Sequence, residues 1–229
     1  MGFQHNDIAV MGGLRAALNE EINMIERNDI VTTYKMNKAI AEGGGGGGLM
    51  SALASATFSG ITEIPDKAFQ SNSTIMAVFV DSSCAKVGDY AFADATSLYT
   101  FDTSEYGGVF ADIGNYAFTN TPLYFMSLNA VDGSSYFTIG DHAFDGCSAM
   151  ESAFVSNPSH IGDYAFANCS SLSQVYLRTG NGFDLPTAGE NIFGSSVASG
   201  FTIYVIAATV SELASLPGWS QYSSYMSQN

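Results

Sequence analysis

The sequence predicts a repeat solenoid of short-stranded coils, mainly β with turns and short helical pieces, preceded by an N-terminal α-helical segment. The first observation is a phenylalanine that recurs at intervals of 22 to 27 residues, which is the period of solenoid repeats. Its positions are Phe69, Phe92, Phe118, Phe144, Phe166 and a weaker Phe193. The second observation is a turn motif before each of the first five, and the third is an apolar run with period two after each of them.

The turn motif consists of an apolar residue, a Gly or Pro, and an acid or amide. We expect the Gly or Pro to let the chain bend and the Asp or Asn to accept backbone N–H groups within that bend. A calcium site between coils is the alternative, but the dense oxygen-ligand spacing of a calcium loop is missing, so turn capping is favoured. The five copies are Ile64-Pro65-Asp66, Val87-Gly88-Asp89, Ile113-Gly114-Asn115, Ile139-Gly140-Asp141 and Ile161-Gly162-Asp163.

The apolar run after each phenylalanine predicts a strand with one face in the core. Alternation then points one column of side chains outward: Phe79, Asp102, Ser127, Phe154, Tyr176 and Tyr204. Its four aromatic members, Phe79, Phe154, Tyr176 and Tyr204, are the candidate binding residues, since binding surfaces are enriched in aromatic side chains. The alternative is that these rings pack on one another across strands or under loops.

Two further columns favour structural explanations. The residues two positions before each phenylalanine are expected to stack because the repeat itself aligns them: Lys67, Tyr90, Tyr116, His142 and Tyr164. Cys147 and Cys169 occupy equivalent positions in adjacent repeats, a separation that permits a disulfide on distance alone. Free, buried thiols that fill the core are the favoured interpretation.

Residues 1–42 are predicted to form a helical anchor or oligomerisation segment. Leu14, Leu18, Ile22 and Ile25 fall on one helical stripe that needs a partner to cover it. Three partners remain open: the second half of the same segment, another subunit in a short bundle, or a docking surface on a larger assembly. Residues 43–48 are six consecutive glycines and predict a flexible hinge, so the repeat domain is assigned to residues 49–229.

Composition excludes several classes of function. Of the 22 acidic and seven basic residues, six acids and four bases lie in residues 1–48, which leaves 16 acids and three bases for the repeats. Such an acidic body is not expected to bind nucleic acid, which needs a basic patch. We expect no membrane insertion and no export signal, because the chain has neither a long apolar run nor a basic leader. No metal-ligand, cofactor-binding or catalytic motif is present, so the protein is not expected to be an enzyme.

The repeat resembles the BspA-type leucine-rich repeat family over about residues 53–229. In that family Ile-Gly-x-x-Ala-Phe, a small residue or Cys, and Leu-x-x-Val-x-Leu form one coil, and Ile161–Leu177 (IGDYAFANCSSLSQVYL) matches this pattern almost position by position. The C-terminal stretch 203–229, with Gly218-Trp219-Ser220-Gln221-Tyr222, is similar to the family's terminal cap. Departures are Pro65 in place of Gly, the degenerate coil around Ile192-Phe193, and inserts at 103–109 and 179–187.

The resemblance implies leucine-rich-repeat-like coils and a non-enzymatic role in adhesion and protein recognition. We expect a phage virion fibre, spike or decoration protein whose N-terminus docks onto virion structural proteins and whose solenoid contacts a protein or glycan of the host surface. A homo-oligomer is expected, with a trimer as one form. The alternative is an extracellular adhesin on a bacterial surface, with its leader or anchor missing from this sequence.

Overall fold

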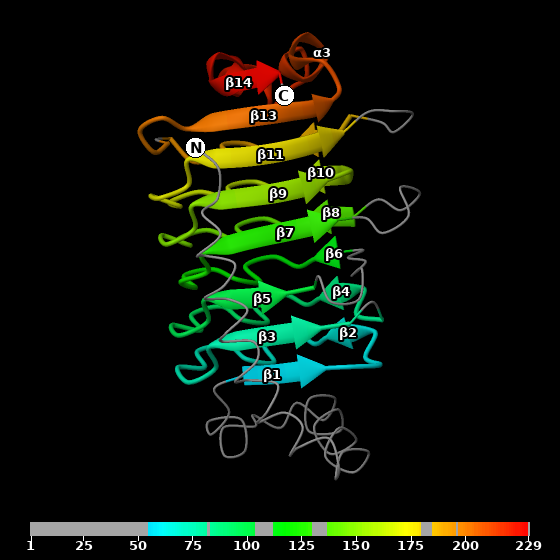
Figure 1. Ribbon diagram of the computed structural model, residues 1–229, viewed down its shortest axis with the longest axis vertical. Helices are drawn as coiled ribbons and strands as arrows, with labels where there is room; N and C mark the ends of the chain where they lie inside the picture. Colours follow the sequence, from blue (N-terminus) through cyan, green and yellow to red (C-terminus); the bar gives the residue numbers. More distant parts are fainter. Residues whose placement is uncertain are drawn as a thin grey trace, which may run out of the picture. The chain divides into compact units, whose positions relative to one another are not determined.

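The computed structural model describes residues 55–81, 83–103, 112–129, 137–179, 185–195 and 197–228. Within these residues the chain winds through a stack of coils, and each coil contributes one longer and one shorter strand (Figure 1). The predicted repeat solenoid is therefore confirmed. The N-terminal helical segment and its residues Leu14, Leu18, Ile22 and Ile25 lie outside the described residues.

The longer strands form one wall of the solenoid, which we call the odd-strand wall. It contains two parallel sheets, ordered β1-β3-β5 and β7-β9-β11-β13-β14, and so also includes the even-numbered last strand, β14. The Tyr124 N–H donates to the Tyr99 carbonyl at 3.3 Å, so the coil register continues from one sheet to the next. The strands are β1 (Ser55–Phe58), β3 (Ala77–Val80), β5 (Thr100–Asp102), β7 (Phe125–Asn129), β9 (Ser152–Ser156), β11 (Gln174–Thr179), β13 (Thr202–Ala207) and β14 (Met226–Gln228).

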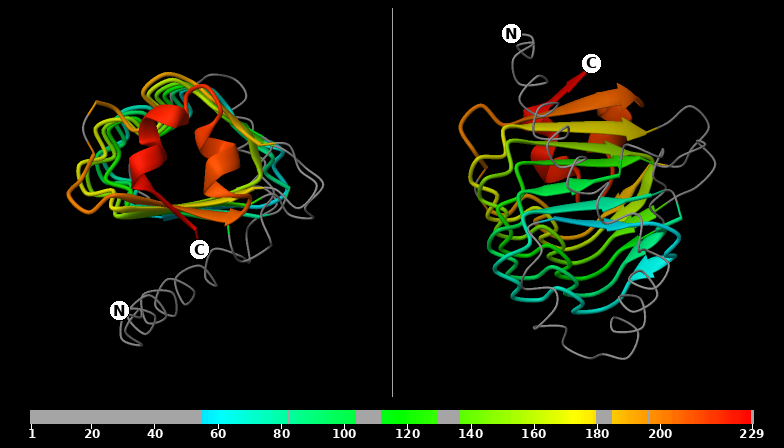
Figure 2. Two further views of the ribbon diagram at one scale, coloured as in Figure 1. Left: turned by 90° about the horizontal axis from the view of Figure 1, so that it is seen from above. Right: turned by 60° about the horizontal axis from the view of Figure 1, so that its bottom comes forward.

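The shorter strands form a third parallel sheet, ordered β2-β4-β6-β8-β10-β12. Each of the first five places an Ile or Val in the core, and those five side chains are almost completely buried. The strands are β2 (Glu63–Ile64), β4 (Lys86–Val87), β6 (Asp112–Ile113), β8 (Phe137–Ile139), β10 (Pro158–Ile161) and β12 (Thr187–Ala188). The left view of Figure 2, seen along the stack, shows that the coils superimpose closely.

The recurring phenylalanines stack along the inside of the solenoid. Successive rings from Phe69 to Phe166 are nearly parallel, with centroids 5.0 to 5.3 Å apart. The weaker Phe193 continues the stack at 5.9 Å from Phe166. One apolar ring per coil therefore gives a continuous core that no single coil could bury alone.

The glycine of the turn motif has a different role from the one predicted. Gly88, Gly114, Gly140 and Gly162 are not among the glycines with positive φ, so the bend does not require their conformational freedom. A Cβ on Gly114 would lie 2.6 Å from the backbone nitrogen of Asp89 in the preceding coil. Glycine is needed because neighbouring coils touch here. Pro65 is tolerated in the first described coil, where the motif meets no earlier described coil.

The acidic residue of the motif also acts between coils. We expected it to accept N–H groups within its own bend, but Asp66 Oδ1 accepts the Asp89 N–H and Asp89 Oδ1 accepts the Asn115 N–H, both at 2.8 Å. The same bond recurs up the stack as far as the Glu190 N–H, which donates to Asp163 Oδ1 at 2.7 Å. These side chains join each coil to the next.

The predicted stacking column adopts the left-handed conformation. Its residues Lys67, Tyr90, Tyr116, His142 and Tyr164 have φ between 54° and 60°. Their stacking is confirmed: ring centroids from Tyr90 to Tyr164 lie 4.7 to 5.1 Å apart, and Lys67 Nζ lies 5.7 Å from the Tyr90 centroid. Non-glycine residues rarely adopt this conformation, and here ring stacking and an N–H bond to the next coil offset its cost.

The C-terminal end of the stack is covered by α3 (Val210–Ala214), the 3-10 helix η4 (Ser220–Tyr225) and β14 (Figure 2). Thr209 and Glu212 form a capping box at the start of α3. Trp219 is fully buried, and its Nε1–H donates to the Pro186 carbonyl at 2.8 Å. Tyr222 packs edge-on against Phe193 and accepts the Phe193 N–H at 3.2 Å. The last phenylalanine of the stack is thereby shielded from water.

The three cysteines are free and buried, as the sequence favoured. Cys147 Sγ donates to the Phe118 carbonyl and Cys169 Sγ to the Phe144 carbonyl, each at 3.2 Å. The contact with the Cys147 thiol, together with burial, holds the pKa of Cys169 well above its usual range. Burial raises the pKa of Cys84 to about 11. All three thiols serve as small core groups.

Candidate interaction face

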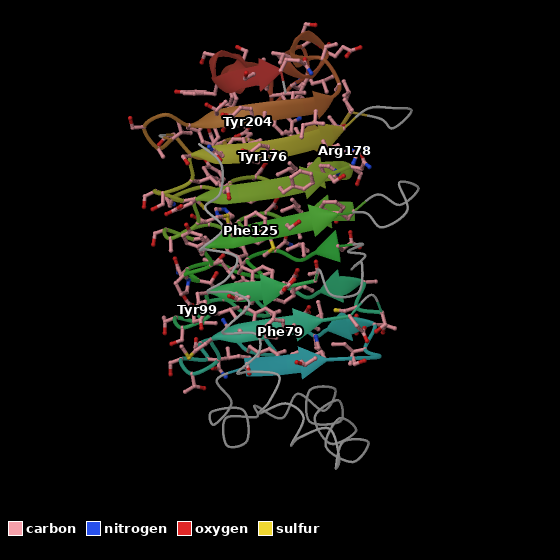
Figure 3. The ribbon with its side chains drawn as sticks, in the orientation of Figure 1. Phe79, Tyr99, Phe125, Tyr176, Arg178 and Tyr204 are labelled. Carbon is pink, nitrogen blue, oxygen red and sulfur yellow. The ribbon has the colours of Figure 1, made fainter. Side chains whose placement is uncertain are left out.

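The outer side of the odd-strand wall carries a concentration of aromatic side chains, which we call the aromatic face (Figure 3). Because side chains alternate along a strand, Val175 and Leu177 of β11 are buried whereas Gln174, Tyr176 and Arg178 point outward. The members of the aromatic face are Phe79, Tyr99, Tyr124, Phe125, Phe154, Tyr176 and Tyr204.

Strand register places the predicted candidates in one column across the wall. Thr57 pairs with Phe79, which pairs with Asp102. Ser127 pairs with Phe154, Phe154 with Tyr176, and Tyr176 with Tyr204, which is followed by Ser227. The main-chain bond from Tyr124 to Tyr99 aligns Asp102 with Ser127. We call this series, from Thr57 to Ser227, the central column.

Three of the four candidate rings lie together and one lies apart. The centroids of Phe154 and Tyr176 are 6.3 Å apart, and those of Tyr176 and Tyr204 are 4.9 Å apart with an interplanar angle of 15°. Phe79 is separated from this group by Asp102 and Ser127. Cross-strand packing explains why the stacked rings are half-buried. The three rings are partly exposed, and Tyr176 Oη donates to Gln174 Oε1 at 3.1 Å.

The aromatic face extends beyond the residues predicted from sequence. Tyr124 and Phe125 are its most exposed rings, with 55% and 45% of their surface accessible, and Tyr99 lies beside them one coil earlier. Tyr124 Oη donates to Glu151 Oε2 at 2.7 Å. Phe125 could have been predicted from the sequence to point outward, because it alternates with Met126 and Leu128, which face inward. Tyr99 and Tyr124 precede their strands, where alternation gives no guidance.

Charge is distributed unevenly between the walls. In the described odd strands only Asp102 and Arg178 are charged. The side of the solenoid formed by the turn motifs, which we call the turn wall, instead carries the column Asp66, Asp89, Asp141 and Asp163. It also carries Asp94 and Asp145, which accept hydrogen bonds from the side-chain amides of Asn120 and Asn168 at 2.8 and 2.7 Å. The aromatic face is therefore a nearly neutral surface on an acidic body.

One carboxylate at the margin of the face is held in a well-defined site. Asp81 follows β3, and burial alone would raise its pKa, but hydrogen bonds from the hydroxyls of Ser59 and Ser83 and from the N–H groups of Ser83 and Gly60 lower it to about 2. The Ser59 Oγ and Gly60 N bonds measure 2.6 and 2.9 Å. This site ties the end of β1 to the end of β3 rather than offering a group for chemistry.

No cluster of three or more His, Cys, Asp or Glu residues suited to a metal ion occurs among the described residues. His142 Nδ1 lies 2.8 Å from Asp145 Oδ2, and His160 Nδ1 lies 2.8 Å from Thr187 Oγ1, so each imidazole contacts a protein group. The carboxylates of the acidic column accept backbone N–H groups. Within the described part of the chain, these polar residues are used in structural hydrogen bonds.

Comparison with known proteins agrees with this geometry. The sequence matches the family described as the BspA type leucine rich repeat region, in six copies, over residues 50–132 and 109–212. The chain belongs to the BspA-type leucine-rich repeat family. No curated protein matches the sequence. Within the part of this BspA-type protein that the structure describes, no helix is long and apolar enough to cross a membrane.

Two solved structures are similar to this BspA-type chain. One is the pneumococcal vaccine antigen PcpA, with 17% sequence identity and a TM-score of 0.50, covering 75% of this chain and 39% of that one. The other is a leucine-rich repeat protein from Bacteroides ovatus, with 16% identity and a TM-score of 0.27, covering 66% of this chain and 60% of that one. The chain thus spans less than two thirds of either. The first likeness supports the fold alone.

Proposed function

We propose that this BspA-type repeat protein is a non-enzymatic binding protein that contacts a surface partner through the aromatic face. The observation that supports the proposal is the concentration of aromatic side chains on a wall with only two charged strand residues, on a body that is otherwise acidic. Tyrosine and phenylalanine supply large contact areas at little conformational cost, and charged residues are depleted from the centre of interfaces.

We further propose that residues 1–42 attach the protein to a larger assembly and that the glycines at 43–48 let the solenoid move relative to it. The setting we favour is a phage virion, in which the repeats are displayed to a host-surface protein or glycan. The order of an amphipathic segment, a glycine run and a repeat domain supports this arrangement. Display on a bacterial surface is the alternative.

The aromatic face is tested with the double substitution Phe154→Ser and Tyr176→Ser in the full chain. We expect binding of the labelled protein to intact bacterial cells to fall at least about tenfold, because two neighbouring anchor residues are lost. Tyr164→Ser is the matched control, since it removes a partly exposed ring from the turn wall. Equal binding by the double variant and the wild type would reject the aromatic face as the site. Protease or periodate treatment of the cells separates a protein partner from a glycan partner.

The attachment segment is tested separately with Leu18→Asp and Ile22→Asp, which place charges in the predicted apolar stripe. We expect the variant to be absent from purified particles or envelope fractions while its solenoid still binds cells. Normal incorporation would reject the assignment of residues 1–42 as the anchor. The fraction in which the wild-type protein is found decides between a virion and a bacterial surface.

A further inference from the structure

We infer that, when the protein is free, the aromatic face of one solenoid is covered by the same face of a second copy. This inference rests on the proposed function, since it takes the aromatic face as the interaction surface and describes how that surface is regulated. The pair has a twofold axis that is parallel to the strands and passes between β7 and β9. The two stacks then run in opposite directions with their aromatic faces in contact.

The central column is self-complementary under this rotation. In coil order it consists of Thr57, Phe79, Asp102, Ser127, Phe154, Tyr176, Tyr204 and Ser227. A twofold axis through its midpoint reverses this order and keeps each residue in the column. Ser127 of one copy then faces Phe154 of the other, Asp102 faces Tyr176, Phe79 faces Tyr204, and Thr57 faces Ser227.

Each of these pairings is chemically favourable. The Phe154 ring meets a small side chain, so two large groups do not compete for the same space. Arg178, two residues further along β11 than Tyr176, lies diagonally across from the Asp102 carboxylate and can donate to it. Phe79 and Tyr204 form an aromatic pair. The neighbouring column repeats the large-to-small pattern, because Phe125 faces Ser152.

The other simple twofold axis, along the solenoid, gives a poor interface. It would place each coil against the same coil of the second copy, so that Asp102 meets Asp102. Like charges directly opposite each other are destabilising across a contact. It would also place Phe154 against Phe154 and Ser127 against Ser127, so that no large side chain meets a small one at these positions. The arrangement of large, small and charged side chains therefore selects the axis parallel to the strands.

Charge and area set the strength of the pair. From residue 49 onward the chain has 16 acids and three bases, so two copies repel one another through most surfaces. The odd-strand wall is the side on which repulsion is least. Seven coils at about 4.8 Å and strands of about five residues give a face on the order of 600 Å² per copy, below the roughly 800 Å² of a standard stable interface. We therefore expect a concentration-dependent dimer that a surface partner can displace.

The test exchanges the large and small members of one pairing. Sedimentation velocity of the full chain is measured over a range of concentrations for the wild type, Ser127→Phe, Phe154→Ser, and the double variant that carries both substitutions. Each single change occurs twice in the pair, at roughly tenfold per site, so Ser127→Phe weakens association about a hundredfold. The double variant restores one large and one small group at each contact and recovers association.

Three results would overturn the inference: a wild-type mass that does not depend on concentration, unchanged association in Ser127→Phe, or no recovery in the double variant. The exchange of Phe125→Ser with Ser152→Phe provides a second pairing if the first variants fold poorly, as judged by circular dichroism. Association through residues 1–42 is common to every variant and cancels in the comparison. A wild type that binds cells but does not dimerise rejects this inference alone, whereas unchanged cell binding by the Phe154→Ser, Tyr176→Ser protein rejects the proposed function.

Discussion

Replacing Gly114 with Ala tests whether the glycine of the turn motif serves the bend or the contact between coils. The new Cβ would lie 2.6 Å from the nitrogen of Asp89 and 2.6 Å from the carbonyl carbon of Gly88. Both are backbone atoms of the preceding coil, so no side chain can move aside. Ordinary contacts of a Cβ begin at about 3.4 Å, and the two coils must therefore separate locally.

Separation of the coils strains the bonds that join them at this point. The Asn115 N–H donates to Asp89 Oδ1 at 2.8 Å, and the Tyr90 N–H donates to the Asn115 carbonyl at 2.9 Å. Overpacking costs about 1–3 kcal/mol and each weakened hydrogen bond about 1 kcal/mol, so we expect Gly114→Ala to lower the free energy of unfolding by about 2–4 kcal/mol. If the glycine only allowed a bend, the sign would reverse. Its φ is not positive, and Ala would then stabilise the protein by about 0.4–1 kcal/mol through the unfolded state.

The assay is guanidinium unfolding of the full chain followed by circular dichroism, with the fluorescence of the single tryptophan, Trp219, as a second probe. Gly200→Ala is the matched control, because Gly200 has a φ of +79° and no atom within 4 Å of a new Cβ. That control should lose only about 1 kcal/mol, from backbone strain. A Gly114→Ala protein as stable as the wild type would refute the explanation based on contact between coils.

Two further predictions concern titratable groups. Asp81 has a pKa lowered to about 2 from an ordinary value of 3.8. The ionised carboxylate therefore adds about 1–2 kcal/mol to the free energy of unfolding, a value already reduced for partial exposure. This contribution is present above pH 4 and is lost as the pH falls toward 2. The difference in unfolding free energy between wild type and Asp81→Asn should disappear over that range, and a difference that persists at pH 2 would contradict the assignment. The second prediction concerns the three cysteines, which are all buried; the pKa values of Cys84 and Cys169 are also raised. We therefore expect a thiol reagent at pH 8 to label none of the three thiols in the native protein and all of them in guanidinium. Rapid labelling of the native protein would show that the core is open.

The coils were predictable from sequence because their requirements are local or recur with the period. The Phe stack and the inward Ile and Val residues follow from the spacing of apolar side chains, and each occupies the same place in every coil. The ring column from Tyr90 to Tyr164 was predictable for the same reason. Its left-handed backbone was not, because local preferences assign that conformation to Gly, Asn or Asp. A contact with the next coil outweighs those preferences.

The same distinction explains the incorrect account of the turn motif. A glycine before an acid indicates a bend when the motif is considered alone, and each copy does lie in a turn. The requirement for glycine comes from contact with the preceding coil. Gly88, for example, lies against Pro65, which is about 23 residues earlier in the chain. Pro65 was therefore informative: it marks a coil whose motif meets no earlier described coil, where a side chain at this position is tolerated.

Positions that the coil does not constrain carry the information about interactions. At Phe92, Phe118 and Phe144 every coil needs the same side chain, so their recurrence indicates packing. In the central column the coil requires only a residue that can face outward, yet Asp102, Ser127 and Phe154 differ sharply in size and charge from one coil to the next. Stacking between adjacent strands would favour an unbroken series of rings, as in the turn wall. Asp102 and Ser127 interrupt the series, and a second copy in reversed order would place Tyr176 and Phe154 opposite them.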